Sequence, residues 1–362
     1  MTEPDTLQQI DRTYVRVGKR RLSYFAGCDY FRLSSHPQVL RALTEGLKKY
    51  GLNVAASRKT TGNHELYGKL EKSLAQFFGS ENAVLVSSGY VTNLIVAQAL
   101  AGNFSHVLMD EKTHPSLLDA AQFFDSPILQ FKHRDTEDLS RVISRIGKNT
   151  KPILLSDGMF SNDGSLAPLK LYLKILPCNS MLLVDDAHGA GTLGKTGKGT
   201  IELEGIPRSR VIQTITLSKA FGVYGGAILG SRDLRERILA KSKMFGGSTP
   251  LPLPLANAAL TAVQILQTHK TLRLRLVQNV SYAKNELRKA GLEISPPPSP
   301  IVAVFPKTSG EAEKLKARCL ANEVFPSFIK YHGGPKNGYF RFAISSEHTK
   351  KQLNALLKAL VG

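Results

Sequence analysis

Two short apolar runs in this chain each end in residues that could do chemistry. The run 181–184 is followed by Asp185 and, three positions later, by His188. The run 211–215 is followed by a threonine, a serine and then Lys219. Ligands of open α/β sheets bind beyond the carboxyl ends of the strands, so we expect the carboxylate, the imidazole and the amine to meet there. A lysine amine among small and hydroxyl residues at such a strand end suits Schiff-base chemistry.

A carboxylate beside that lysine suits one cofactor in particular. The pyridinium nitrogen of pyridoxal phosphate needs an acidic partner that keeps it protonated. Each motif alone has a structural alternative, in which Asp185 caps a helix and Lys219 is a solvated surface amine. The two motifs together, in this order, favour the chemical interpretation.

The elements that must position these groups follow a regular alternation. Apolar runs predict strands, and longer amphipathic stretches between them predict helices. The predicted strands are 83–87, 106–110, 128–131, 153–156, 181–184, 211–215 and 227–229, and helices include 65–78, 91–101, 116–123 and 137–146. The alternation predicts an α/β fold with a mostly parallel sheet covered by helices on both faces.

The pattern changes after three closely spaced prolines near position 250. Helices are predicted there over 255–268, 272–290 and 310–322, strands over 301–305 and 339–345, and a last helix from 347. This order predicts a smaller α+β domain at the carboxyl end. We therefore divide the chain into a segment 1–35, a large domain 36–250 and a small domain 251–362.

Composition narrows the range of functions. The chain of 362 residues has an ordinary hydrophobic fraction of 42%, and no apolar run approaches the roughly 18 residues that span a bilayer. Three widely spaced cysteines predict neither a disulfide framework nor a metal site, and they fit a reducing cytoplasm. The net charge of +19 would suit nucleic acid or an acidic partner, but the basic residues form no stripe. A solvated basic surface is favoured over nucleic-acid binding.

The motif VDDAHGAG, followed by TLSKAFG, resembles the α-oxoamine synthases, which are pyridoxal-phosphate enzymes of fold type I, the aspartate aminotransferase type. The sequence Asp-Asp-Ala-His-Gly is most similar to the 8-amino-7-oxononanoate synthases of biotin biosynthesis. The resemblance covers nearly the whole chain and implies a cytoplasmic homodimer. It implies that Lys219 holds the cofactor as an aldimine and that Asp185 pairs with the ring nitrogen. It also implies that segment 1–35 packs with the small domain.

The resemblance assigns further cofactor contacts. The turn Ser88-Gly89-Tyr90 opens a predicted helix, whose free amides suit the cofactor phosphate. His114 is implied to lie over the ring and touch the substrate, and both Ser161 and His188 to hold the ring's phenolic oxygen. The remaining implied cofactor contacts are Thr216 and, across the dimer, Thr249. Three of these have a plain structural alternative: the turn at 88–90 could be an ordinary helix entry, His114 a partly buried histidine at a helix start, and the turn at Thr249 an ordinary proline-containing turn.

Two positions near the chain ends are implied to bind substrate. Arg341 lies between two phenylalanines on a predicted strand, and a guanidinium suits a carboxylate. Cys28 replaces an asparagine that assists the substrate carboxylate in the family. The stretch 53–58 is bulkier than the glycine-rich family motif, and Ala343 replaces a hydroxyl residue. These departures bear on substrate choice and leave the lysine, aspartate and histidine unchanged.

The resemblance implies decarboxylative condensation of an amino acid with an acyl thioester. L-alanine and a pimeloyl thioester, carried on coenzyme A or an acyl carrier protein, are the implied substrates. A sibling enzyme that uses glycine or serine, such as a 2-amino-3-ketobutyrate ligase or a long-chain acyl condensing enzyme, stays open. An alternative of another class is a non-catalytic protein that binds anions or nucleic acid on the same fold.

Overall fold

The chain folds into two compact units. The computed structural model describes residues 6–147, 149–330 and 335–362. The large unit comprises 36–160 and 166–268, and the small unit comprises 1–35, 161–165 and 269–362. The large unit thus extends beyond the predicted boundary at 250, because helix α10 (Leu253–Thr268) packs on α1 (Pro37–Tyr50) and α2 (Glu65–Phe78).

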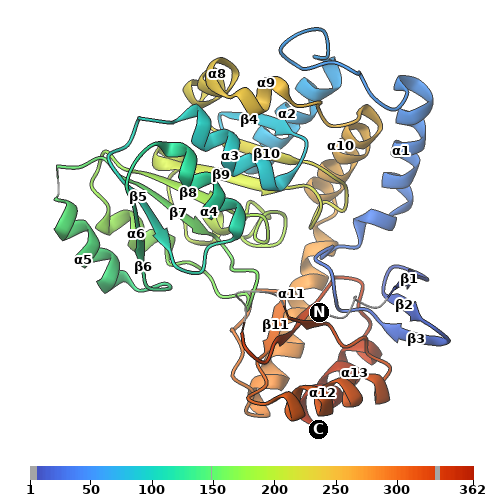
Figure 1. Cartoon of the computed structure of the whole chain (residues 1–362). Helices are drawn as coiled ribbons and strands as arrows, with labels where there is room; N and C mark the ends of the chain where they lie inside the picture. The colour runs from blue at the N-terminus through green and yellow to red at the C-terminus, as the bar shows by residue number, and fades with distance from the viewer. Residues whose placement is uncertain (1–5, 148, 331–334) are drawn as a thin grey trace. The chain divides into compact units, whose positions relative to one another are not determined.

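A seven-stranded sheet forms the centre of the large unit (Figure 1). Its spatial order is β4 (Asn82–Val86), β10 (Gly226–Gly230), β9 (Val211–Thr216), β8 (Met181–Asp185), β7 (Ile153–Asp157), β5 (Val107–Asp110) and β6 (Ile128–Phe131). Strands β6, β5, β7, β8 and β9 are parallel, and β10 runs antiparallel to both β9 and β4. The predicted mostly parallel sheet is confirmed.

Two hydrophobic cores lie on opposite faces of this sheet. Side chains alternate along a strand, so Leu183 of β8 packs in one core while Leu182 and Val184 pack in the other. Each fully buried leucine of this kind contributes about 1.5–3 kcal/mol to stability. Strands that are buried on both faces are continuous apolar runs, which is why the sequence pattern located them.

Helices cover both cores. The first core includes residues of α3 (Gly89–Ala99), α4 (Pro115–Ala121), α8 (Arg232–Lys241) and α9 (Lys243–Gly247). The second includes residues of α5 (Thr136–Ile146), α6 (Leu169–Ile175) and α7 (Thr200–Leu203). Short 3-10 turns occur at η1 (Leu33–Ser35), η2 (Gln122–Phe124) and η3 (Arg208–Arg210).

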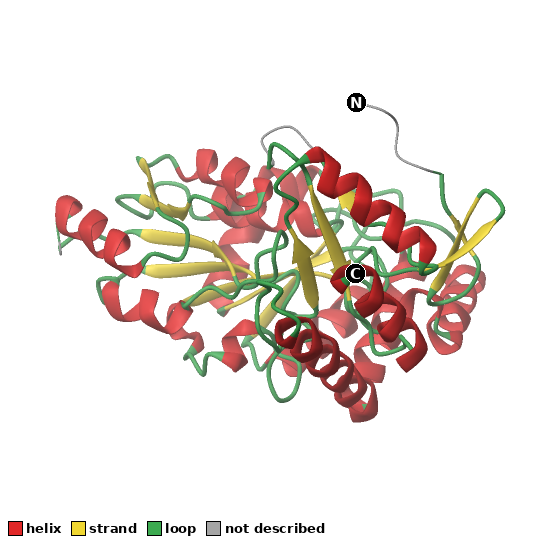
Figure 2. Cartoon of the chain, turned by 90° about the horizontal axis from the view of Figure 1, so that it is seen from below, coloured by secondary structure: helices red, strands yellow, loops and turns green. Residues whose placement is uncertain are grey.

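The small unit contains two short antiparallel sheets (Figure 2). One has the order β11 (Ile301–Val304), β13 (Tyr339–Ala343) and β12 (Phe328–Ile329), and the other consists of β1 (Gln8–Gln9), β2 (Tyr14–Val17) and β3 (Arg20–Ser23). Its helices are α11 (Lys270–Lys289), α12 (Ser309–Ala321) and α13 (Lys350–Val361). The amino-terminal segment joins this unit, since Ser23 pairs with Val324 and the Phe25 carbonyl accepts from the amide of Ala343.

Among the described residues, no helix combines the length and the apolar character that a membrane span requires.

Candidate active site

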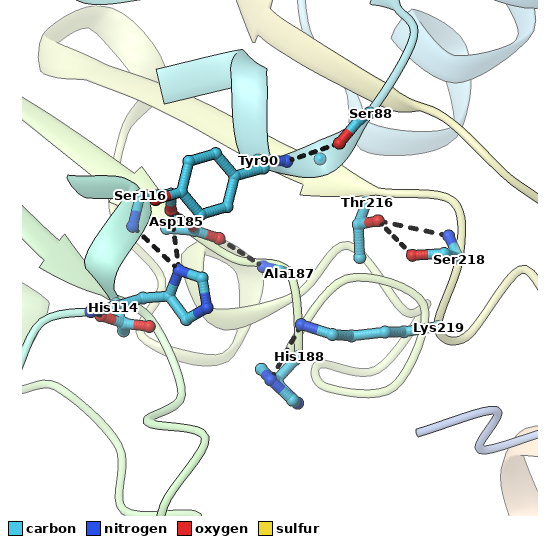
Figure 3. Close-up of a pocket in the computed structure, with 12 residues that line it drawn as sticks. Ser88, Tyr90, His114, Ser116, Asp185, Ala187, His188, Thr216, Ser218 and Lys219 are labelled. Atoms are coloured by element: carbon cyan, nitrogen blue, oxygen red, sulfur yellow. Dashed lines mark hydrogen bonds between the residues drawn. The ribbon is translucent and has the colours of Figure 1, made fainter. Parts of the chain in front are cut away.

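The carboxyl ends of five strands of the large unit meet at one edge of its sheet. Strands β5, β7, β8 and β9 are parallel, and β4 runs in the same direction as β9 because both are antiparallel to β10. The segments that follow these ends line a cavity of about 180 Å³. Its lining residues are Ser88, Gly89, Tyr90, His114, Ser116, Asp157, Asp185, Ala187, His188, Thr216, Ser218 and Lys219 (Figure 3).

Asp185 is the carboxylate of this cavity, and three donors hold it. Asn93 of α3 donates to its Oδ2 at 2.7 Å, and the hydroxyl of Ser116 donates to the same oxygen at 3.3 Å. The backbone amide of Ala187 donates to Oδ1 at 3.1 Å. These three hydrogen bonds fix the direction of the carboxylate group. Asp185 can therefore present its oxygens in a fixed orientation to a cation in the cavity.

The adjacent Asp186 has a structural role instead. It is fully buried, and Thr200 donates to it from its backbone amide and its hydroxyl, both at 2.9 Å, while Gln213 donates at 2.6 Å. Burial raises the pKa of Asp186 to about 7 against these hydrogen bonds. Its contacts close the turn that carries His188, so of the two consecutive aspartates only Asp185 faces the cavity.

Lys219 lies in the turn that joins β9 to β10. The amide of Leu217 donates to the carbonyl of Gly225 at the base of this turn, and Gly225 has a φ of +110°, which favours glycine. The amine of Lys219 lies 2.9 Å from Nε2 of His188 (Figure 3). The geometry places an amine and an imidazole within proton-transfer distance of each other.

His114 faces the cavity from the start of α4. Its Nδ1 lies 2.8 Å from the Ser116 hydroxyl, and its backbone amide donates to the carboxylate of Asp157 at 2.8 Å. Burial lowers the pKa of His114, so its neutral form is favoured. The Tyr90 ring meets it edge-on, with 6.1 Å between ring centroids. Burial and the nearby Asp185 raise the pKa of Asp157 well above its usual range.

The start of α3 contributes Ser88, Gly89 and Tyr90 to the cavity lining, and we call this turn the backbone cradle. The Ser88 side chain caps the helix by accepting from the amide of Tyr90 at 3.1 Å. A methyl group on Gly89 would lie 2.6 Å from Cβ of Thr216, so only glycine lets this turn approach β9. The hydroxyls of Thr216 and Ser218 lie 2.7 Å apart beside it. Amides and hydroxyls converging at a helix N-terminus suit a phosphate group.

Eight of the residues predicted from sequence line this one cavity: Ser88, Gly89, Tyr90, His114, Asp185, His188, Thr216 and Lys219. The other four lie elsewhere. Ser161, Arg341 and Cys28 belong to the small unit, and Thr249 is exposed in the large unit and absent from the cavity lining.

Two predicted residues of the small unit contact each other. Arg341 donates from Nη1 to the carbonyl of Ser161 at 3.3 Å. Cys28 and Arg341 both lie near the buried Tyr30. Burial raises the pKa of that phenol, Cys28 adds to the increase by charge and hydrogen bonding, and Arg341 opposes it.

The structure adds groups that the sequence analysis did not assign. Asn93 and Ser116 hold Asp185, and Asp157 and Ser218 line the cavity. The signal in the sequence for Asn93 is a polar residue within the apolar stretch that forms α3. The structure shows that this residue is fully buried. No cluster of histidine, cysteine and acidic residues among the described residues suits a metal ion.

Comparisons with known proteins identify the family of this chain. The family model for class I and II aminotransferases matches residues 28–360. The 8-amino-7-oxononanoate synthase of Thioalkalivibrio sulfidiphilus is 34% identical over 95% of this chain and 88% of its own length. The enzyme of the same name from Thermoanaerobacter pseudethanolicus is 33% identical over 91% of this chain and 85% of its own.

Solved structures show the same fold. A serine palmitoyltransferase from S. paucimobilis with a bound pyridoxal-phosphate–myriocin aldimine superimposes with a TM-score of 0.92, at 25% identity over 99% of this chain and 91% of its own. The 8-amino-7-oxononanoate synthase of Francisella tularensis superimposes with a TM-score of 0.81, at 27% identity over 93% of this chain and 96% of its own. The chain therefore belongs to the class I and II aminotransferase family and, within it, to the α-oxoamine synthases, the pyridoxal-phosphate-dependent acyltransferases.

Proposed function

We propose that this enzyme condenses L-alanine with a pimeloyl thioester to give 8-amino-7-oxononanoate, a step of biotin biosynthesis. The observation that carries the proposal is the cavity in which Lys219, His188 and Asp185 converge. The two curated relatives at 33–34% identity bear the name of this activity, and each aligns with more than nine-tenths of this chain.

The lining residues fit pyridoxal phosphate. The amine of Lys219 suits the carbonyl carbon of the cofactor, and the oriented carboxylate of Asp185 suits its ring nitrogen. The N-terminus of α3 suits its phosphate. The crowded Gly89, which leaves no room for a side chain, keeps the backbone amides of the turn accessible. When bound, the cofactor supplies an electron sink for the carbanion that forms next to the amino group of the substrate.

Each lining residue then has a definite task. Lys219 holds the cofactor and moves the α-proton of the substrate. His188 lies 2.9 Å from the amine of Lys219 and forms a hydrogen bond with it. Asp185, whose carboxylate is oriented by Asn93, would pair with the ring nitrogen and keep it protonated. His114 would contact the ring as a neutral imidazole, which burial favours. Ser88, Gly89, Tyr90 and Thr216 bind the phosphate.

The remaining roles involve the small unit and a second copy of the chain. Arg341 binds the carboxylate of the amino acid until that group leaves as carbon dioxide, and Cys28 contributes to the same substrate site. Ser161 binds the phenolic oxygen of the ring. Thr249 is exposed and outside the lining of its own chain, so its contact with the phosphate requires a homodimer. Sedimentation showing a fully active monomer would contradict the dimer.

A sibling activity with serine or glycine is the second candidate. Serine palmitoyltransferases superimpose with TM-scores of about 0.92, and Cys28 and Ala343 replace residues that shape the substrate site in the family. A thiol and a methyl group in place of an amide and a hydroxyl change the space and the hydrogen bonds available to the amino acid. This observation bears on substrate choice and leaves the reaction type unaltered.

One assay separates the candidates. Free thiol release is measured with alanine, glycine and serine, each against pimeloyl, acetyl and palmitoyl thioesters of coenzyme A. The proposal expects the highest kcat/KM for alanine with the pimeloyl donor, and a preference for serine or glycine would overturn it. Lys219→Ala serves as the control, since it should lose both thiol release and the cofactor retained covalently after borohydride treatment.

A further inference from the structure

Segment 161–165 belongs to the small unit, whereas the chain on either side of it belongs to the large unit. Met159 and Leu166 pair with each other in the large unit. The segment carries Ser161, to which the proposed function assigns the phenolic oxygen of the cofactor. What holds these five residues therefore decides where Ser161 points.

Strand β13 holds the first two residues of the segment. Arg341 donates to the carbonyl of Ser161 at 3.3 Å, and the hydroxyl of Tyr339 donates to Oδ1 of Asn162 at 3.2 Å. Tyr339 and Arg341 are two positions apart on the strand, so both side chains project from the same face. The side-chain carbonyl of Asn162 is the acceptor that makes the bond from Tyr339 possible.

The connection before β11 holds the rest of the segment. The hydroxyl of Ser295 donates to the carbonyl of Asp163 at 2.9 Å, and the buried amine of Lys284 donates to that hydroxyl at 2.9 Å. Gly164 has a φ of +72°, and a methyl group there would lie 2.2 Å from Oγ of Ser299. The carboxyl end of the segment is thus anchored independently of β13.

The two tethers from β13 are not equivalent. Arg341 is the residue assigned to the substrate carboxylate, and its guanidinium must share its donors once substrate binds. The proposed function assigns no substrate contact to Tyr339, and its ring stacks on Phe305 with 5.3 Å between centroids. The hydrogen bond from Tyr339 to Asn162 is therefore the contact from β13 that does not compete with the proposed binding of substrate.

We propose that Tyr339, acting through Asn162, is a positioning residue that holds Ser161 in place for its contact with the cofactor. The proposal rests on the role assigned to Ser161 in the proposed function. It concerns cofactor binding, so it can be tested without reference to the amino acid or the acyl donor.

The test uses two matched variants of the full chain. Tyr339→Phe removes one phenol–asparagine hydrogen bond and keeps the ring, and Tyr282→Phe removes the equivalent bond to Oδ1 of Asn354 elsewhere in the small unit. The dissociation constant of pyridoxal phosphate from the apoprotein and the absorption maximum of the bound cofactor are measured for each. We expect Tyr339→Phe to weaken binding about fivefold and to shift the absorption maximum, and Tyr282→Phe to leave both unchanged.

A double-mutant cycle shows whether the effect passes through Ser161. If it does, Tyr339→Phe has no further effect in the Ser161→Ala background, so the two changes are non-additive. Hydrogen exchange over 158–166 should also become faster in Tyr339→Phe alone. Additive losses, equal effects of the two phenylalanine variants, or a Tyr339→Phe protein identical to the parent would each overturn the proposal. If Ser161 does not contact the cofactor, the Ser161→Ala variant will bind pyridoxal phosphate as tightly as the parent protein. That result also overturns the proposal.

Discussion

At the scale of single residues, the arrangement of the cavity depends on a residue outside its lining. The proposed role of Asp185 needs a carboxylate of fixed direction, and Asn93 provides the shortest of its hydrogen bonds, at 2.7 Å. The carbonyl oxygen of Asn93 in turn accepts from the hydroxyl of Thr214 at 2.7 Å, which fixes the orientation of the amide. This chain from β9 through α3 to β8 sets the position of the carboxylate.

We predict that Asn93→Ala weakens cofactor binding by about 10- to 100-fold, since a hydrogen bond to a charged group contributes about 1.5–3 kcal/mol. The measurement is a titration of the apoprotein with pyridoxal phosphate. Asn279→Ala is the matched control, because Asn279 also donates two hydrogen bonds, to the carbonyls of Ser345 and His348 in the small unit. Equal affinities of the two variants would remove Asn93 from this role.

The sequence predicted the residues at the strand ends and missed those that reach them from elsewhere. Asp185 and Lys219 follow apolar runs directly, so their placement is a local property of the chain. Asn93 is 92 positions from Asp185 and lies within a helix whose apolar pattern indicates only burial. The resemblance selects Asp185 rather than Asp186, and the structure supplies a physical reason for the difference, because Thr200 and Gln213 hold the carboxylate of Asp186 away from the cavity.

Lys284 is a buried amine that the proposed reaction does not use. Burial lowers its pKa to about 7, Asp163 opposes this, and Arg288 adds to it. In the unfolded chain a lysine has a pKa of about 10.4, so between about pH 7 and pH 10 the unfolded chain binds more protons than the folded one. The free energy of unfolding therefore rises with pH over this range. The destabilisation caused by burying the charged amine of Lys284 is greatest below about pH 7.

Lys284→Met removes that titration. We expect the variant to gain more in melting temperature, relative to the parent protein, at pH 6 than at pH 9.5, as measured by thermal unfolding of the holoenzyme. Lys270→Met, at an exposed position of the same helix, is the control and should show little difference between the two pH values. The same gain for Lys284→Met at both pH values would contradict the buried charge.

At the scale of elements, the cofactor cradle depends on how closely α3 approaches β9. A methyl group on Gly89 would lie 2.6 Å and 2.7 Å from Cβ and Oγ1 of Thr216, both of which are too close. Position 89, the first residue of α3, must therefore be glycine for packing reasons, independently of any ligand. The same close approach brings the helix amides and the Thr216 hydroxyl to one place.

Gly89→Ala should push the start of α3 away from β9. We predict a loss of about 1–3 kcal/mol in stability from overpacking, together with weaker cofactor binding. Gly68→Ala is the matched control, because Gly68 lies inside α2 with no atom within 4 Å of the added methyl group. That control should gain about 0.5–1 kcal/mol through helix propensity. Denaturant unfolding and a cofactor titration measure both effects, and an unweakened cofactor affinity in Gly89→Ala would count against the cradle.

Element positions were largely predictable, and boundaries less so. Strands β8 and β9 begin where their apolar runs begin, because buried parallel strands have no polar face to interrupt the pattern. Helix α10 was predicted from its composition but assigned to the small domain. Its place in the large unit comes from contacts with α1 and α2, which no local pattern reports.

At the scale of the whole molecule, the net charge is unevenly divided. The small unit has 22 Lys and Arg against 11 Asp and Glu, a net +11, and the larger unit has 26 against 18, a net +8. More than half of the total of +19 thus belongs to the smaller of the two units. A field of one sign attracts anionic ligands and acts mainly on the rate of encounter.

Both proposed acyl carriers are anionic, but they differ in size. Coenzyme A carries a few phosphates, whereas an acidic carrier protein presents many carboxylates and meets many lysines and arginines at once. We therefore predict that a protein-bound acyl donor is used at least as well as the coenzyme A thioester. Its kcat/KM should fall more steeply than that of the thioester as salt shortens the Debye length from about 30 Å to about 8 Å. Thiol release measured for both donors across this range tests the prediction, and equally shallow slopes would show that the charge does not select the carrier.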